Sequence, residues 1–300
     1  MIPSKIILNG HLKGSKIAAN VYSIQSKASK SGKKAITIIV AHANGFHKEL
    51  YEPMIRNILE RISNVVNENI YYEKIVSVDF YSQGDSDWLD YSRDLITIVD
   101  QLDLSSGQTI GIGNSLGACS MLAAEIMRPS LFKSIIAMEP TIRALPRKGA
   151  SVSPLTEATL KRKNEFKSKE EFKDYLKSKS FFKAWTDEII DLHVEYGLTK
   201  DFSDGKDIWK LKCDPIIEAN TYNGSGNALY MYANKAELIQ CPLVLVRGMV
   251  STFTTKESFS EFASKIRFGR VIEIPNCGHL IPLEVPEISA NIVVEVLSTL

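Results

Sequence analysis

A short stretch, residues 109–121, constrains the fold of this 300-residue chain more than any other. It reads T-I-G-I-G-N-S-L-G-A-C-S-M, which predicts a buried strand, a sharp turn at Ser115 and the start of a helix. Gly113 and Gly117 stand two residues either side of Ser115 and leave room for strand and helix to cross closely. The pattern G-x-S-x-G is that of a nucleophile elbow, so we expect the Ser115 hydroxyl to project beyond the carboxyl end of a strand.

Segments on both sides of this stretch alternate between strand and helix patterns. Apolar runs typical of buried parallel strands stand at residues 35–40, 74–80, 132–138, 242–247 and 270–274, after two N-terminal strands at 5–9 and 16–23. Apolar residues recur at helical spacing in residues 52–66, 91–102, 116–127, 256–265 and from 284 onward. The alternation predicts an α/β fold with a mostly parallel central sheet and helices on both faces. Ligands of such folds bind beyond the carboxyl ends of the strands.

The alternation stops between residues 142 and 240. Lysine-rich stretches with helical spacing occur here, at 160–166 and 170–185, without a clear buried strand. We therefore expect a core of residues 1–141 and 241–300, with residues 142–240 inserted as a helical cap. The lysines alternate with Glu and Asp, which is typical of a solvated helix face rather than of a nucleic-acid-binding surface.

Charge and composition limit the partners and the cellular compartment that we expect for this chain. The formal net charge of +1 favours neither nucleic acid nor acidic partners. The N-terminal residues lack the apolar run of a signal peptide, and no run of about 18 apolar residues could cross a membrane, so we expect no stable membrane insertion. The four cysteines are widely spaced and fit reduced thiols. We predict a cytoplasmic location; the alternative is peroxisomal, because Ser298-Thr299-Leu300 distantly resembles the S-K-L signal. The sequence does not indicate the oligomeric state.

A serine nucleophile needs a base and a group that orients the base. His279 lies in the loop after the last predicted strand and so reaches the same sheet edge as Ser115. The loop after residues 242–247 contains no carboxylate before Glu257. Residues 132–138, by contrast, run directly into Glu139, which we expect to orient the imidazole. The alternative for Glu139 is a structural carboxylate at the base of the cap.

The loop A-H-A-N-G-F follows residues 35–40 and opens at the same edge of the sheet. Such a turn can present a backbone N–H to a carbonyl oxygen, so we expect the N–H groups of Asn44 and Leu116 to form an oxyanion hole. His42 and Gly45 are expected to support this loop rather than to transfer protons. His42, His47 and nearby carboxylates lack a recognised ligand spacing, and we therefore predict no metal site.

With these motifs in place, the chain resembles the α/β-hydrolase superfamily over about residues 35–140 and 242–300. The resemblance rests on G-N-S-L-G, on H-A-N-G, on Y-S-Q-G-D-S after residues 74–80, and on G-H-L-I-P-L-E-V-P-E. The arrangement is similar to the capped branch that includes lipases, esterases, epoxide hydrolases, dehalogenases and carbon–carbon bond hydrolases. A-H-A-N-G-F-H-K-E further resembles fungal members related to peroxisomal lipases and toxin-biosynthesis hydrolases.

Two departures from the family pattern stand out. Ala43 replaces the usual glycine of H-G, and the missing acid after residues 242–247 matches sub-branches that carry it one strand earlier, as Glu139 would here. The family's dehalogenases and epoxide hydrolases use an aspartate nucleophile, so Ser115 argues against both.

The sequence thus predicts a serine hydrolase that cleaves a carboxylic ester with an apolar acyl group, as an esterase or lipase does. Ser115, His279 and Glu139 would act through an acyl-enzyme, without cofactor or metal. Two alternatives stay open. One is a thioesterase or carbon–carbon bond hydrolase that uses the same residues, and the other is a non-catalytic ligand-binding protein on the same fold.

Overall fold

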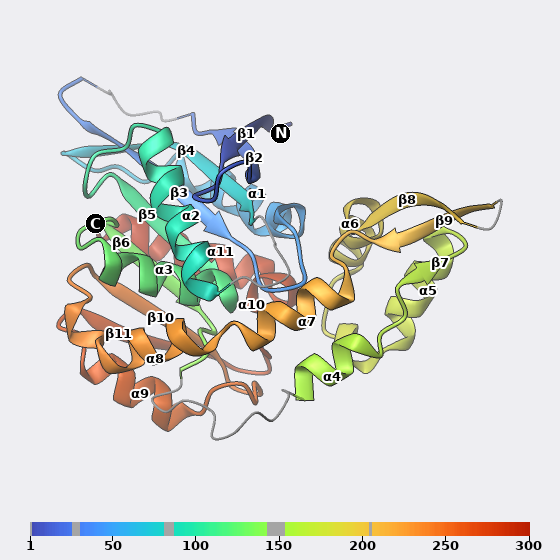
Figure 1. Cartoon of the computed structure of the whole chain (residues 1–300). Helices are drawn as coiled ribbons and strands as arrows, with labels where there is room; N and C mark the ends of the chain where they lie inside the picture. Colours follow the sequence, from blue (N-terminus) through green and yellow to red (C-terminus); the bar gives the residue numbers. More distant parts are fainter. Residues whose placement is uncertain (1, 26–30, 81–86, 143–153, 204–205) are drawn as a thin grey trace.

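An eight-stranded sheet forms the centre of the molecule in the computed structural model, which describes residues 2–25, 31–80, 87–142, 154–203 and 206–300 (Figure 1). Residues 81–86, which carry the Y-S-Q-G-D-S motif, lie outside the described ranges. Across the sheet the strand order is β1-β2-β4-β3-β5-β6-β10-β11. β1 and β2 run antiparallel to their neighbours, and the other strands are parallel. The predicted α/β fold is confirmed.

The strands match the predicted segments closely. They are β1 (Ser4–Asn9), β2 (Lys16–Ser23), β3 (Lys34–Ala41), β4 (Ile70–Asp79), β5 (Thr109–Asn114), β6 (Ser134–Met138), β10 (Leu243–Gly248) and β11 (Gly269–Ile274). Every residue of β5, β6 and β10 is buried, which explains their continuous apolar runs. β4 begins four residues before the predicted strand, because Ile70 pairs with Lys34 ahead of a register shift between Ile36 and Thr37.

Helices cover both faces of the sheet. α1 (Glu52–Ile62) packs against α11 (Pro286–Ser298) on one face, with the short α10 (Ile281–Glu284) beside α11. α2 (Trp88–Gln101), α3 (Leu116–Met127), α8 (Gly226–Asn234) and α9 (Lys256–Ser264) lie on the other. Burial of one Leu, Ile or Val side chain in such a core contributes about 1.5–3 kcal/mol. Because many such side chains are buried on each face, the two helix layers fix the strands and their carboxyl ends in place.

A second group of elements projects to one side of the core (Figure 1). It comprises α4 (Pro154–Leu160), β7 (Glu165–Phe166), α5 (Lys169–Ser178), α6 (Asp187–Tyr196), β8 (Leu198–Ser203), β9 (Lys206–Leu211) and α7 (Pro215–Asn223). The expectation of a helical insertion needs a correction, because β7, β9 and β8 form an antiparallel sheet beside these helices. Its strands pair through their backbones and carry mostly exposed or half-buried side chains, such as the ion pair Lys210–Asp201, so no apolar run marks them in the sequence.

The helix predicted at 160–166 is likewise corrected. α4 ends at Leu160, and Phe166 turns inward from β7 to pack against Phe172 and Tyr175. α8 falls within the segment assigned to the cap but contacts α2 and α3 of the core. The boundaries 142 and 240 remain a prediction.

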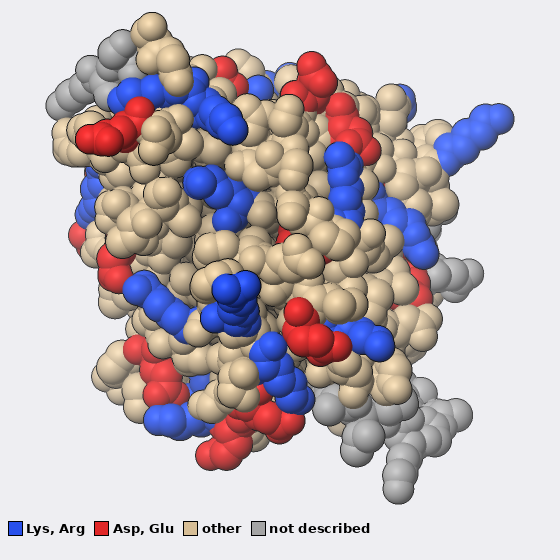
Figure 2. All heavy atoms as spheres, turned by 90° about the vertical axis from the view of Figure 1, so that its left-hand side faces the viewer, with Lys and Arg blue, Asp and Glu red and all other residues tan. Residues whose placement is uncertain are grey.

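Surface charge is mixed rather than segregated. On the face shown in Figure 2, lysines and arginines are interspersed with aspartates and glutamates. None of the described helices is both long and apolar enough to cross a membrane.

Candidate active site

Ser115 lies at the turn between β5 and α3. Its φ is +51° and its ψ −114°, a backbone conformation that residues with a side chain rarely adopt. A Cβ on Gly117 would lie 2.3 Å from the carbonyl oxygen of Ala41, and one on Gly113 would lie 2.4 Å from the nitrogen of Ala118. The glycines of G-x-S-x-G are therefore required by the close approach of strand and helix. The strained turn is the geometry predicted for an elbow.

The structure brings Glu139 and His279 together. Glu139 follows β6 directly and is fully buried, and His279 lies in the loop after β11. Nδ1 of His279 is 3.0 Å from Oε2 of Glu139. A carboxylate only accepts hydrogen bonds, so Nδ1 carries the proton and Nε2 is the nitrogen that can accept one.

Asn114 connects this pair to the turn at Ser115. Its side-chain Nδ2 donates to the carbonyl oxygens of both Met138 and His279, each at 3.1 Å. The backbone N–H of Ser115 also donates to Met138, at 2.9 Å. These bonds connect the three backbone segments that carry Ser115, Glu139 and His279. Sequence reasoning did not single out Asn114, because its bonds join residues far apart in the chain.

The loop after β3 is held in place by its own side chains. His42 donates from Nδ1 to the carbonyl oxygen of Ala43 at 2.8 Å, and its Nε2 accepts the N–H of Phe80 at 3.1 Å. Burial lowers the pKa of His42 below its usual value, which keeps the ring neutral. Both nitrogens are thus occupied, one by the loop itself and the other by Phe80 directly after β4. That geometry fits a supporting role for His42.

The predicted oxyanion donors lie where this loop meets α3. The N–H of Ala43 is occupied by the hydroxyl of Tyr51 at 2.9 Å, so the next residue, Asn44, supplies the candidate donor of the loop. Leu116 is the first residue of α3, and its N–H has no partner within the helix. The Asn44 side chain donates to the carbonyl oxygen of Glu218 on α7 at 3.2 Å. This bond links the loop after β3 to the projecting elements.

Gly45 gives a test of that link. It has a φ of +80°, and a Cβ there would lie 2.5 Å from Cδ of Glu218, whose carboxylate is held by an ion pair with Arg162. We expect Gly45→Ala to lower the free energy of unfolding by about 2 kcal/mol, because the positive φ disfavours a residue with a Cβ and the carboxylate of Glu218 leaves no room for the methyl group. Denaturant titration measures this loss. Gly226→Ala is the matched control, because a Cβ there meets no atom within 4 Å and we expect no loss of stability.

A cavity of about 790 Å³ lies between the core and the projecting elements. Aromatic side chains form much of its wall, among them Phe46, Phe80, Phe172, Phe181, Phe182 and Tyr222. Asn44 and Leu116 line it too, whereas Ser115 and His279 do not. The cavity therefore borders the candidate oxyanion donors, one of which directly follows Ser115 in the chain.

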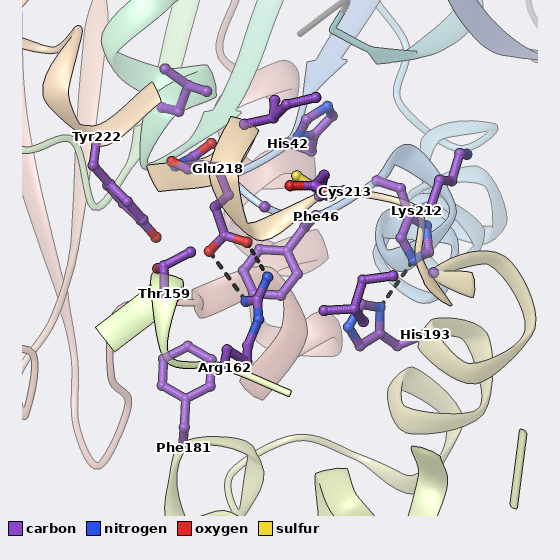
Figure 3. Close-up of a pocket in the computed structure, with 18 of the residues that line it drawn as sticks. His42, Phe46, Thr159, Arg162, Phe181, His193, Lys212, Cys213, Glu218 and Tyr222 are labelled. Atoms are coloured by element: carbon purple, nitrogen blue, oxygen red, sulfur yellow. Dashed lines mark hydrogen bonds and ion pairs between the residues drawn. The ribbon is translucent and has the colours of Figure 1, made fainter. Parts of the chain in front are cut away.

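Several polar contacts interrupt this aromatic wall, and two of them are drawn in Figure 3. Arg162 forms a bidentate ion pair with Glu218, and Nδ1 of His193 lies 3.2 Å from Nε2 of His47. Burial and the neighbouring His47 hold the pKa of His193 well below its usual value. None of these contacts was predicted, because each joins residues from separate elements. In the described part of the chain, no group of three or more His, Cys, Asp or Glu side chains could hold a metal ion.

Residues 38–291 match the model of the alpha/beta hydrolase family. The chain belongs to this family. Among individual relatives, type I acyl-CoA thioesterase mpaH' of Penicillium brevicompactum is 28% identical over 120 residues, which cover 37% of this chain and 28% of the thioesterase. Peroxisomal membrane protein LPX1 of Saccharomyces cerevisiae is 22% identical over 200 residues, which cover 57% of this chain and 51% of LPX1. The chain thus matches about half or less of the length of these relatives.

Solved structures agree on the fold. The peroxisomal alpha-beta-hydrolase Lpx1 of S. cerevisiae superimposes with a TM-score of 0.76 and 16% identity, over 99% of this chain and 89% of Lpx1. An esterase of Mycobacterium tuberculosis superimposes with a TM-score of 0.69 and 20% identity, over 99% of this chain and 92% of the esterase. At these identities the likeness concerns the fold alone. The chain is a hydrolase-family protein with esterases and thioesterases among its neighbours.

Proposed function

We propose that this protein is a serine hydrolase that cleaves a carboxylic ester with an apolar acyl group. The observation that supports this most is the 3.0 Å contact between His279 Nδ1 and Glu139 Oε2, tied through Asn114 to the strained turn that carries Ser115. The aromatic cavity beside Asn44 and Leu116 supports an apolar acyl group. The segment 142–240 is proposed as the cap that closes over it.

The proposed reaction begins with attack of the Ser115 Oγ on the ester carbonyl, while Nε2 of His279 takes the hydroxyl proton. Glu139 holds the imidazole and stabilises its positive charge. The N–H groups of Asn44 and Leu116 bind the oxyanion, and each is worth about 3 kcal/mol of transition-state stabilisation. His279 then gives its proton to the leaving alcohol. Water, activated by His279, hydrolyses the acyl-enzyme, so the cycle needs no cofactor.

The second candidate is hydrolysis of a thioester by the same residues. The similarity to an acyl-CoA thioesterase over 120 residues favours it. The same serine, base and oxyanion donors serve an acyl-CoA, since the acyl-enzyme is identical and only the leaving group differs. The likeness to peroxisomal Lpx1 likewise supports the peroxisomal alternative to a cytoplasmic location.

Labelling with a fluorophosphonate probe, followed by a substrate panel, tests both candidates. We expect the folded protein, and not the heat-denatured one, to be labelled. Nitrophenyl esters and acyl-CoA thioesters of matched acyl length then rank the two leaving groups by kcat/KM. A folded protein that resists labelling by probes of every size, and turns over neither panel, would instead fit the non-catalytic binding protein.

A further inference from the structure

The end of β10 and the loop that follows it, residues 248–254, contact both Glu139 and His279. The backbone N–H of Gly248 donates to Oε1 of Glu139 at 2.8 Å. The hydroxyl of Ser251 donates to Oε2 of the same carboxylate at 2.6 Å. This segment supplies no acid to the site, yet it supplies two of the three donors that surround the acid.

The hydroxyl of Ser251 has its direction fixed by a second contact. Its oxygen accepts the backbone N–H of Phe253 at 3.3 Å, which leaves its proton to point at Glu139. Oε2 of Glu139 therefore receives two hydrogen bonds, one from Ser251 and one from Nδ1 of His279. Together with the N–H of Gly248 on Oε1, these bonds select one rotamer of the carboxylate. A carboxylate without Ser251 would keep only one partner on the oxygen that faces the imidazole.

The ring of Phe253 restrains the imidazole directly. The rings of Phe253 and His279 are stacked with their centroids 3.9 Å apart and their planes 17° from parallel. Phe253 is 38% exposed, so it stands between one face of the imidazole and solvent. Its neighbour Thr254 is buried and donates to the carbonyl oxygen of Pro140 at 3.1 Å, which anchors the loop beside Glu139.

We propose that Ser251 and Phe253 are positioning residues of the hydrolase, Ser251 for the carboxylate of Glu139 and Phe253 for the plane of the His279 ring. The inference rests on the proposed function, in which His279 transfers the proton. A hydrogen bond at Nδ1 leaves the ring free to rotate about that bond, and a stacked face removes this freedom. Catalytic groups must keep their orientation to within about 10–20° for efficient proton transfer, so both restraints act on kcat.

Ser251→Ala is the test of the hydrogen bond. We expect kcat for a nitrophenyl ester to fall about 10-fold at constant KM, because the buried carboxylate of Glu139 loses one of its donors. The melting temperature should fall only slightly, since the donors from Gly248 and His279 remain. Ser251→Thr keeps the hydroxyl and should restore most of the rate. Thr252→Ala removes the adjacent, exposed hydroxyl and should match the wild type. Equal kcat in Ser251→Ala and the wild type would overturn the role of Ser251.

Phe253→Ala is the test of the stacked ring. We expect kcat to fall about 10-fold at constant KM, while Phe253→Tyr, which keeps an aromatic face, retains the wild-type rate. Val250→Ala serves as the control for loss of an exposed apolar side chain in the same loop. A loss that appears in KM alone, or equally in Val250→Ala, would show that Phe253 contacts substrate or only packs the loop. Absence of labelling in the wild type would overturn the proposed function itself, whereas a labelled, active wild type with unaffected variants would overturn this inference alone.

Discussion

Replacement of Ser115 with alanine is expected to lower kcat for ester hydrolysis by about 10⁴-fold or more and to abolish labelling by a fluorophosphonate. The hydroxyl is the nucleophile in the proposed mechanism, and nothing else at the turn between β5 and α3 can form the acyl-enzyme. A small residual rate over water is expected, because the N–H groups of Asn44 and Leu116 would still polarise the carbonyl. Steady-state kinetics with a nitrophenyl ester measures the loss.

The control for this prediction lies one turn along the same helix. Ser120 is fully buried in α3, and its hydroxyl donates to the carbonyl oxygen of Leu116 at 2.7 Å. Ser120→Ala should keep labelling and turnover, and the melting temperature of Ser115→Ala should stay close to that of the wild type. Hydrolysis at the wild-type rate by Ser115→Ala would exclude Ser115 as the nucleophile.

Much of the core could be predicted because its signals are local. Fully buried strands such as β5 and β10 produce continuous apolar runs. The glycines of G-x-S-x-G indicate that a strand and a helix pack closely within a few residues of each other. The meeting of Glu139 with His279 was predicted from topology, since both follow parallel strands whose carboxyl ends share one edge. Each of these inferences needs only the order of strands and helices along the chain.

The parts that were missed depend on contacts between distant segments. In the loop after β10 no sequence pattern marks the hydroxyl of Ser251 or the ring of Phe253, because their contacts with Glu139 and His279 exist only in the folded chain. The ion pair of Arg162 with Glu218 likewise joins the loop after α4 to α7, which are far apart in the sequence. The small sheet of β7, β9 and β8 escaped because its exposed strands lack an apolar run.

Substitution of Glu139 by glutamine is the second large expected effect, a fall in kcat of about 10³-fold or more. In the structure the carboxylate receives three donors, the N–H of Gly248 on Oε1 and both the Ser251 hydroxyl and Nδ1 of His279 on Oε2. A glutamine has one acceptor oxygen and one NH₂ group. Whichever way the amide is turned, its NH₂ faces at least one of these donors.

The mismatch disturbs either the tautomer of His279 or the position of the side chain at residue 139. If the amide oxygen faces Gly248, the NH₂ meets Nδ1 of His279 and drives the ring into the wrong tautomer, with Nε2 protonated and unable to accept the Ser115 proton. If it is turned the other way, the buried N–H of Gly248 loses its partner and the side chain is pushed from its rotamer. Glu257, at the start of α9, is the control, because its exposed carboxylate lies on the helix surface and Glu257→Gln should leave kcat unchanged. The kcat values of the two variants on one ester test this assignment of the acid. A low kcat in Glu257→Gln together with an active Glu139→Gln would assign the acid to α9 and leave Glu139 as a structural carboxylate beneath the cap.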